Sequence, residues 1–423
     1  MTGAALPAER GSLWRNDAFL RLWVADAVSQ LGTAVTGLAL PLTAVVALQA
    51  GAAQMGLLAA ARQVPYLLTS LLVGVWVDRL PRRWIMVATD LGRGLLLALI
   101  PIAAWLGVLS IELLYLIAFL VGLLAVFAEV AATSFVPRIV GREQIYDANG
   151  RLQVSGSVAS VGGPGLAGAL VQAVGAPFAI ALDAVSFLLS ALLVGSIRAD
   201  EAPRGRRGQP ADFWREVREG LVGLLGVRVI RDMVISSALG NLGLQIGGAV
   251  LFLYLVRELE LDPALVGAVF AVQGLAAVAG AAVASRVGRR IGPGPAVVFG
   301  TLLFELGLLA RPLAAGPWPL PLAILVVTQL VLGFGAPIYS VNQIGVRQQM
   351  TPDHLLGRVN ASRRFIVFGV GPIGALIGGL LGEAIGWRPT LLVGGGVAVL
   401  SFLWVFLSPV RSLREVPPRA MSL

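Results

Sequence analysis

The stretch Gly74-Val75-Trp76-Val77-Asp78-Arg79-Leu80-Pro81-Arg82-Arg83 is a short charged connector between two long apolar runs. A bilayer core is roughly 30 Å thick and takes about 20 apolar residues as helix, so the stretch is predicted to be a loop between membrane-spanning helices. Ser285-Arg286-Val287-Gly288-Arg289-Arg290 lies between two later apolar runs and repeats this charge pattern, with Ser in place of Asp. This internal repeat predicts a chain built from two similar halves.

The composition is that of an integral membrane protein. Hydrophobic residues make up 57% of the 423 residues and charged residues 13%, whereas a soluble domain carries about 25% charged residues. The arginines behind the net charge of +9 lie in the gaps between apolar runs, which argues against nucleic-acid binding, since that needs a basic face. Cysteine is absent and His354 is the one histidine, so neither a metal nor a cofactor is expected.

Windows of membrane-spanning length predict twelve helices. Their ranges are 19–48, 53–77, 84–107, 112–136, 152–174, 177–197, 232–256, 264–284, 294–315, 319–345, 360–384 and 387–409. The divisions at 174/177 and 384/387 each rest on a tight turn at a glycine. The predicted fold class is therefore an all-α membrane protein, with six helices in an N-terminal half (1–197) and six in a C-terminal half (232–423).

The polar segment 198–231 is predicted to join the halves. It begins with a linker rich in Pro, Gly and Arg and continues with apolar residues at helical spacing. Those residues are Phe213, Val217, Leu221 and Leu224. This pattern is typical of an amphipathic helix that lies on the inner leaflet of a membrane.

The placement of the arginines predicts the orientation. The N-terminus, the gaps after spans 2, 4, 6, 8 and 10, and the C-terminus hold 27 arginines when Arg21, Arg363 and Arg364 at the adjoining ends of spans are included, whereas the opposite gaps hold only Arg257, Arg311 and Arg388. Cytoplasmic loops carry the excess of positive charge. Both termini are therefore expected in the cytoplasm, with the protein in the plasma (inner) membrane.

Further echoes support the repeat. Asn149-x-Arg151 precedes Gly163-Pro164 as Asn360-x-x-Arg363 precedes Gly371-Pro372, and two repeats in one orientation are a plan of secondary transporters. At this point the chain resembles the major facilitator superfamily over its whole length. The pattern Gly74-x-x-x-Asp78-Arg79-x-x-Arg82-Arg83 is similar to the signature loop of that superfamily between spans 2 and 3.

The resemblance implies that the signature loop acts as a gate, although Pro81 stands where a glycine is commoner in the family. Gly74 permits close approach of helices. Asp78 and Arg82 lie near the membrane edge and can exchange partners between two helix packings. The alternative is that the arginines of the loop only set the topology.

Span 5 contains Ala159-Ser160-Val161-Gly162-Gly163-Pro164-Gly165-Leu166-Ala167-Gly168, which resembles the antiporter motif G-x-x-x-G-P-x-x-G-G with Ala at two glycine positions. A proline inside a helix removes a backbone hydrogen bond and kinks the helix. The resemblance implies that Gly163, Pro164 and Gly168 form an antiporter motif. It therefore implies export rather than uptake. The alternative is close packing alone, because Gly371-Pro372-x-Gly374 shows the same features in span 11.

Ionisable side chains inside spans indicate function, because each costs several kcal/mol unless it is paired or hydrated. The acids well inside the predicted spans, away from their ends, are Asp26, Asp90, Glu129, Asp183 and Glu305. The family architecture implies that spans 1, 4, 7 and 10 line the central cavity, so Asp26 and Glu129 rank first for proton coupling. Glu305 is retained because it lies nearest to mid-depth, although packing on an outer helix is the competing interpretation.

Two pairings remain open. Arg93 can pair with Asp90, three residues earlier on one helix, or with Asp26 at similar depth. If Arg93 pairs with Asp26, Glu129 or Glu305 becomes the better proton carrier. Glu129 has a rival role, because in the family an acid in the inner half of span 4 can partner the arginines of the signature loop.

Polar residues at helical spacing predict the walls of a substrate cavity. They are Gln30 and Thr33 on span 1, Thr133 on span 4, Asn241 and Gln245 on span 7, and Gln329, Tyr339 and Gln343 on span 10. For each residue alone, the alternative is a hydrogen bond between helices.

The expected function is proton-coupled efflux of a small amphipathic compound by a monomer in the lipid bilayer. Within the superfamily the chain resembles the bacterial macrolide and siderophore efflux branch, through Ser29-Gln30-Leu31-Gly32, the signature loop and Gly357-Arg358-Val359-Asn360-Ala361. The alternatives are uptake, or a role as a sensor or lipid mover on the same fold. An enzyme is not expected, since no catalytic constellation occurs, and the chain lacks the G-x-x-x-x-G-K-[ST] loop of an ATP-driven pump.

Overall fold

The computed structural model describes residues 13–69, 80–198, 210–352 and 355–415, and it contains no strand within these ranges. In chain order, its helices are α1 (Asp17–Leu42), α2 (Ala52–Thr69), α4 (Arg82–Trp105), α5 (Ile111–Ile139), α6 (Ile145–Val174), α7 (Ala176–Gly195), α8 (Pro210–Gly226), α9 (Arg228–Leu253), α10 (Pro263–Ile291), α11 (Pro293–Ala310), α12 (Leu320–Met350), α13 (Leu356–Ile385) and α14 (Trp387–Leu407).

Eleven of the described helices are long and apolar enough to cross a membrane. Helix α2 is not among these eleven; it corresponds to the predicted span 53–77, and its described part ends at Thr69. The predicted all-α membrane fold is confirmed. Several helices run beyond the predicted windows, as α6 begins at Ile145 and α12 continues to Met350. The reason is that hydropathy locates the bilayer core, whereas backbone hydrogen bonding continues into the polar headgroup region.

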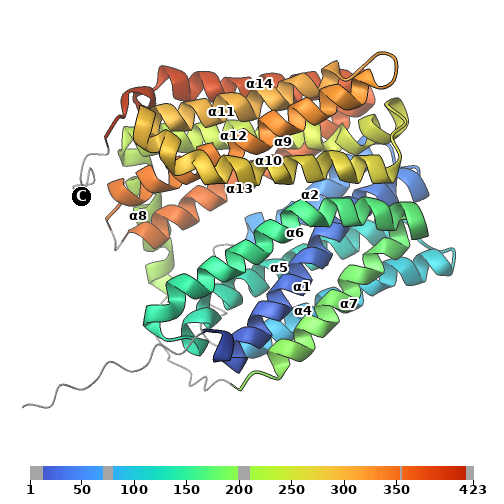
Figure 1. Cartoon of the computed structure of the whole chain (residues 1–423), viewed down its shortest axis with the longest axis horizontal. Coiled ribbons are helices and arrows are strands. Elements are labelled where there is room, and N and C mark those ends of the chain that lie inside the picture. Colours follow the sequence, from blue (N-terminus) through green and yellow to red (C-terminus); the bar gives the residue numbers. More distant parts are fainter. Residues whose placement is uncertain (1–12, 70–79, 199–209, 353–354, 416–423) are drawn as a thin grey trace, which may run out of the picture.

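The helices form two bundles (Figure 1). The N-terminal bundle contains α1, α2 and α4 to α7, and the C-terminal bundle contains α9 to α14. Between the bundles, the main contacts are those of α2 with α13 and of α6 with α10. The boundaries of the halves at 197 and 232 stay a prediction.

The two bundles repeat one plan in detail. Helix α1 ends in a π-helical turn at Thr43–Ala47, and α9 ends in another at Tyr254–Glu258. Each turn precedes a residue in the left-handed region, Gln49 and Glu260, both with φ of 52°. A π-turn is rare and frequently functional, so its occurrence at both equivalent positions strengthens the case for an internal repeat.

Tight turns at two glycines separate the helices whose division was least clear in the sequence. Gly175 joins α6 to α7 and Gly386 joins α13 to α14, each with φ of 89°. Glycine adopts this backbone conformation without the steric cost that a Cβ would bring. The predicted divisions at 174/177 and 384/387 are therefore confirmed.

Caps and long-range hydrogen bonds fix the positions of α1 and α5. The Asn16 side chain accepts a hydrogen bond from the Phe19 N–H (3.1 Å), which caps the start of α1, and its amide donates to the Ile139 carbonyl at the end of α5 (2.9 Å). Ser110 caps the start of α5 by accepting from the Leu113 N–H (3.3 Å). A cap satisfies backbone donors that have no partner within the helix.

The molecule has two different ends. We call the end with Leu13–Arg15, α8 and Pro409–Ser412 the terminal end, and the opposite end the distal end. One hydrophobic cluster joins the bundles toward the distal end, with members such as Met55 in α2 and Val266 in α10. At the terminal end each bundle has its own cluster. The bundles are therefore packed together distally and have separate cores at the terminal end.

The predicted amphipathic helix of the linker is present as α8, and it packs against the C-terminal bundle. A Cβ placed on Gly220 would lie 2.7 Å from the Arg358 carbonyl oxygen of α13. Leu224 is fully buried in the terminal-end cluster of the C-terminal bundle. Contact of α8 with the inner leaflet stays a prediction.

Candidate functional site

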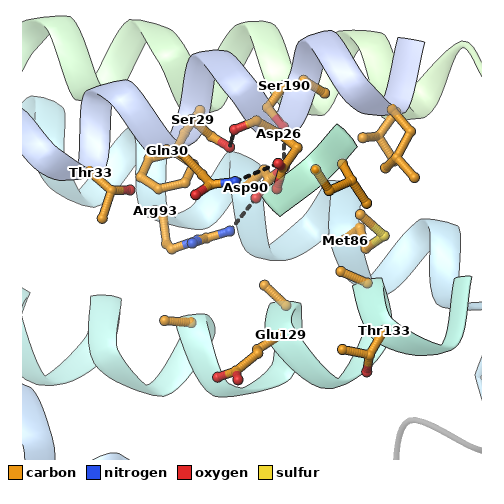
Figure 2. A pocket seen from close by; sticks show the side chains of 18 of the residues that line it. Asp26, Ser29, Gln30, Thr33, Met86, Asp90, Arg93, Glu129, Thr133 and Ser190 are labelled. Carbon is orange, nitrogen blue, oxygen red and sulfur yellow. Dashed lines mark hydrogen bonds and ion pairs between the residues drawn. The ribbon is translucent and has the colours of Figure 1, made fainter. Parts of the chain in front are cut away.

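A cavity of about 490 Å³ lies in the N-terminal bundle, bordered by α1, α2, α4, α5, α6 and α7. Its polar lining residues include Asp26, Ser29, Gln30, Thr33, Asp90, Arg93, Glu129, Thr133, Asn149 and Ser190 (Figure 2). Its apolar lining includes Leu22, Tyr66, Met86, Val136, Phe187 and Val194. This volume falls within the range of about 300–1,000 Å³ typical of small-molecule sites, and the mixed lining suits an amphipathic molecule.

Asp26 is the acid of this cavity that has no cationic partner among the described residues. Its Oδ2 accepts a hydrogen bond from Gln30 Nε2 (2.5 Å), and its backbone carbonyl accepts from Ser29 Oγ (3.1 Å). Both partners are neutral and lie on the same helix, α1. The carboxyl group therefore remains available to a proton or to a basic group of a ligand.

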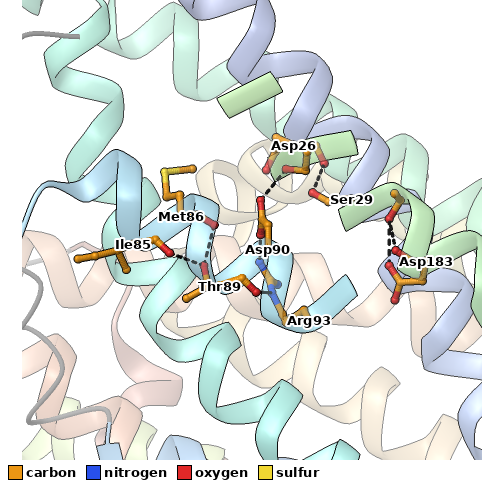
Figure 3. A network of polar contacts seen from close by, with 10 residues as sticks. Asp26, Ser29, Ile85, Met86, Thr89, Asp90, Arg93 and Asp183 are labelled. Carbon is orange, nitrogen blue, oxygen red and sulfur yellow. Dashed lines mark hydrogen bonds and ion pairs between the residues drawn. The ribbon is translucent and has the colours of Figure 1, made fainter. Parts of the chain in front are cut away.

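Arg93 pairs with Asp90, so the first of the two pairings open in the sequence is the one formed (Figure 3). Ser190 Oγ of α7 donates a second hydrogen bond to Asp90 Oδ2 (2.6 Å). The Arg93 guanidinium also lies 4.0 Å from the centre of the Phe187 ring, a favourable cation–π distance. This arginine is thus held by α4 and α7, which leaves Asp26 without an ion pair to it.

Glu129 bridges the two bundles. Both of its carboxylate oxygens accept hydrogen bonds from Arg364 Nη2 of α13, at 3.0 and 3.1 Å. The two side chains are 45% and 42% exposed, so the pair is worth about 1 kcal/mol or less. A weak pair of this kind can open without a large cost. The sequence had offered the arginines of the signature loop as partners, and the partner in the described structure is Arg364.

The signature loop is described only in part. Gly74, Asp78 and Arg79 lie outside the described residues, and Arg82 begins α4. Arg83 donates a hydrogen bond to the Gly195 carbonyl at the end of α7. The described part of the loop thus ties α4 to α7 at the terminal end, and the predicted gate role remains a prediction.

The antiporter-like motif lies at the contact between the bundles. A Cβ placed on Gly168 would lie 2.6 Å from the Pro263 carbonyl oxygen and 2.9 Å from the Gly267 Cα of α10. In return, a Cβ on Gly267 would lie 2.4 Å from the Pro164 carbonyl oxygen. Gly163 makes a similarly close approach to α1. The motif therefore permits backbone-to-backbone packing of α6 against α10 and close contact with the Ala34 side chain of α1.

Two of the cavity candidates in the C-terminal bundle belong to one hydrogen-bonded chain. Ser237 of α9 bonds to the Tyr339 hydroxyl and accepts from Gln343 Nε2 (3.0 Å). The Gln343 carbonyl oxygen accepts from Arg347 Nη1 (3.2 Å), and Arg347 Nε donates to Asn360 Oδ1 (2.9 Å). This series of hydrogen bonds connects α9, α12 and α13.

The remaining cavity candidates of this bundle are Asn241, Gln245 and Gln329. The Asn241 amide donates to the Val367 carbonyl (2.6 Å), and Gln245 packs beside Gly374. Gln329 is 2% exposed; it accepts from Arg311 Nη2 (3.1 Å) and donates to Gln273 Oε1 (3.3 Å). These contacts between helices correspond to the alternative interpretation, and a substrate role for the three residues stays a prediction.

Two acids lie away from the cavity. Asp183 is 1% exposed and accepts from Ser186 Oγ (3.1 Å). Glu305 is 3% exposed against Gly240 and Ser401, and its Oε2 has no hydrogen-bond partner within the described ranges. Across those same ranges, no three histidine or acidic side chains gather where a metal ion could bind. Neither acid lines the cavity that contains Asp26.

Comparison with known proteins identifies the family to which the sequence belongs. Residues 12–421 match the family described as transmembrane secretion effectors. The chain is 28% identical over 390 residues to the multidrug efflux pump Tap of Mycobacterium tuberculosis (strain ATCC 25618 / H37Rv), with 89% of this chain and 90% of Tap covered. It is 26% identical over 352 residues to the enterobactin exporter EntS of Escherichia coli O127:H6, with 82% and 81% covered.

Solved structures share the fold at low sequence identity. The nucleoside transporter NupG superposes with a TM-score of 0.71 at 14% identity, covering 92% of this chain and 99% of NupG. A bacterial homologue of the iron transporter ferroportin, described as inward-facing, superposes with a TM-score of 0.72 at 17% identity, covering 95% and 100%. Since the family match spans nearly the whole sequence, the chain belongs to the transmembrane secretion effector family of major facilitator superfamily transporters.

Proposed function

We propose that the chain is a secondary active exporter that exchanges protons for a small amphipathic compound by alternating access. The observation that carries the proposal is the unpaired carboxyl group of Asp26 in a cavity of drug-like volume. Export is favoured over uptake because two relatives that span most of the chain are named a multidrug efflux pump and an enterobactin exporter.

The closure of the distal end supports alternating access. Arg257 at the end of α9 donates hydrogen bonds to the Val45 carbonyl (2.9 Å) and to Gln49 Oε1 (3.3 Å) of the N-terminal bundle. A Cβ placed on Gly56 would lie 2.8 Å from the Gly379 Cα of α13. We take this arrangement as the state that receives substrate at the terminal end. A related fold described as inward-facing is consistent with this assignment.

Exchange at Asp26 requires no covalent step. A carboxyl group in an apolar cavity binds either a proton or a basic group of the substrate, and each excludes the other. A conformational change is driven only by differential binding to its two states. The site therefore moves to one side of the membrane with a proton on the carboxyl group, and to the other side with substrate on the carboxylate. Glu129 is the alternative proton carrier or a partner, and Glu305 is the third candidate.

We place the terminal end in the cytoplasm, because 27 arginines lie in the N-terminus, the gaps of that side with their adjoining span ends, and the C-terminus, against three in the opposite gaps. A reporter that is active only in the cytoplasm is expected to be active when fused after Leu423, and a reporter active only outside is expected to be silent. Activity of the external reporter alone would contradict both the orientation and the count of twelve spans.

The exporter proposal predicts lower accumulation of a cationic amphiphile in cells that overproduce the protein. We expect such cells to hold less ethidium than cells with an empty vector and to tolerate a higher concentration of it. A proton uncoupler is expected to abolish the difference, because the gradient drives the exchange. Fluorescence of cell-associated ethidium with and without uncoupler provides the measurement. Increased accumulation would indicate uptake, and a difference that survives the uncoupler would refute proton coupling.

A further inference from the structure

Arg347 is a buried cation that contacts only neutral groups. The residue is 5% exposed, and its guanidinium donates to the side-chain oxygens of Asn360 (2.9 Å) and Gln343 (3.2 Å). In the part of the chain that the structure describes, no carboxylate pairs with it. A buried charge without a counter-ion is costly. A guanidinium group in this environment therefore favours binding of an anion.

Arg363 adds a second positive charge at the same place. It is half-buried and lies on α13 one turn after Asn360, the residue that accepts a hydrogen bond from Arg347. No described residue accepts a hydrogen bond from Arg363, and no described acid forms an ion pair with it. Two guanidinium groups held near each other without a carboxylate favour an external anion.

The surroundings of the two arginines include further polar groups and a contact with the opposite bundle. The Tyr339 hydroxyl shares a hydrogen bond with Ser237, which also accepts from Gln343, a partner of Arg347. The next residue of α13, Arg364, reaches Glu129 of the opposite bundle. This part of α13 therefore faces the N-terminal bundle.

We propose that Arg347 and Arg363 form a subsite for an acidic group, a carboxylate or a phosphate, of an amphipathic ligand that enters from the terminal end. This inference rests on the proposed function where it assigns the subsite to the exported compound. With Asp26 on the opposite bundle, the subsite then selects zwitterionic amphiphiles, which place a basic group at Asp26 and an acidic group at the arginine pair. The head group of an anionic lipid offers the same chemistry.

Binding of matched probes tests the subsite. The purified full-length protein is placed in nanodiscs of phosphatidylcholine, and binding of octyl phosphate and of octanol is followed by tryptophan fluorescence and thermal stabilisation. We expect octyl phosphate to bind more tightly by about tenfold or more, since charge-assisted hydrogen bonds contribute about 1.5–3 kcal/mol. Arg363→Gln is expected to remove this preference.

The control variant is Arg358→Gln, on the same helix, because Arg358 pairs with Glu219 of α8. It is expected to keep the preference for octyl phosphate. Arg347→Gln is expected to behave like Arg363→Gln, which carries the test alone if the buried substitution prevents folding. Equal binding of the two probes to the wild type, or an unchanged preference in Arg363→Gln, overturns the proposal.

A second arm separates the two sources of the acidic group. Nanodiscs that contain phosphatidylglycerol are compared with nanodiscs of phosphatidylcholine alone. Weaker octyl phosphate binding in the former supports the subsite with a lipid head group as its occupant, and unchanged binding supports it with the exported compound as its occupant. Because binding is measured without transport, loss of the subsite leaves the ethidium result standing, and failure of the ethidium test leaves the subsite standing.

Discussion

Asp26→Asn is expected to abolish export driven by a proton gradient while retaining exchange of substrate for substrate at a raised substrate concentration, because the neutral amide binds the basic group of the substrate more weakly than the carboxylate does. Asparagine has nearly the shape of aspartate and can still hydrogen bond to Gln30, which lies 2.5 Å from the carboxylate, but it cannot take up and release a proton. A variant locked in one charge state can carry substrate in both directions, because the conformational change itself is not blocked. Coupling to the gradient is what disappears.

Proteoliposomes separate the two activities. Driven efflux is measured as loss of preloaded ethidium after a pH step, and exchange is measured as loss of the same dye against external dye without a gradient. Glu129→Gln and Glu305→Gln are the comparison variants, since they test the other two candidate acids. Driven efflux at the wild-type level in Asp26→Asn would show that Asp26 is not the proton carrier. Selective loss in either comparison variant would assign the role to that acid.

Gly168→Ala is expected to cause the second large loss of transport. The added Cβ would lie 2.6 Å from the Pro263 carbonyl oxygen and 2.9 Å from the Gly267 Cα, which are backbone atoms that cannot rotate away. Overpacking of this kind costs about 1–3 kcal/mol, so the population of the distally closed state should fall by about 5- to 150-fold relative to the open state. Gly162→Ala is the matched control, because a Cβ placed on Gly162 would have nothing within 4 Å of it.

The natural absence of cysteine gives this prediction a direct readout. A cysteine introduced at Thr33, which lines the cavity, is labelled in intact cells by a membrane-impermeant thiol reagent. We expect slow labelling in the otherwise unchanged protein and in Gly162→Ala, and fast labelling in Gly168→Ala, because the distal end is then open. Equal transport and equal labelling in the two alanine variants would contradict the role of α6–α10 packing in closure.

Most of the fold was predictable from the sequence for a simple physical reason. The bilayer fixes the length of each apolar run, and a spanning segment must satisfy its own backbone hydrogen bonds. Arginine-rich gaps and the glycines at positions 175 and 386 then mark where one helix ends and the next begins. The additional helical turns of α6 and α12 at the terminal end were not predictable in this way, because they lie beyond the apolar core of the bilayer.

The site was predictable only where one helix determines it. Asp26, Gln30 and Thr33 follow one face of α1, and the structure places all three at the cavity. Partners on other helices depend on how helices rotate and pack, and single-helix spacing does not contain that information. Arg364 is the clearest case, since it was counted only as a topology signal and yet pairs with Glu129 across the bundles.

The C-terminal bundle shows the same limit, because residues predicted to line a cavity there form contacts between helices. Gln329 and Gln343 follow helical spacing on a predicted cavity helix, but both are nearly fully buried and bonded to Arg311 and Arg347. Those two arginines are the missed signal. Arg347 lies one turn after Gln343 in α12, and Arg311 lies just before that helix; such an arginine can form a buried polar contact as readily as it can set the topology.

The most direct test of the central claim measures the protons released when substrate binds. Purified protein in unbuffered solution is mixed with tetraphenylphosphonium at a series of starting pH values, and the change in pH is recorded. If proton and cationic substrate compete for Asp26, the wild type and Glu305→Gln release protons on binding and Asp26→Asn releases none. Equal proton release by the wild type and Asp26→Asn would contradict exchange at this carboxyl group.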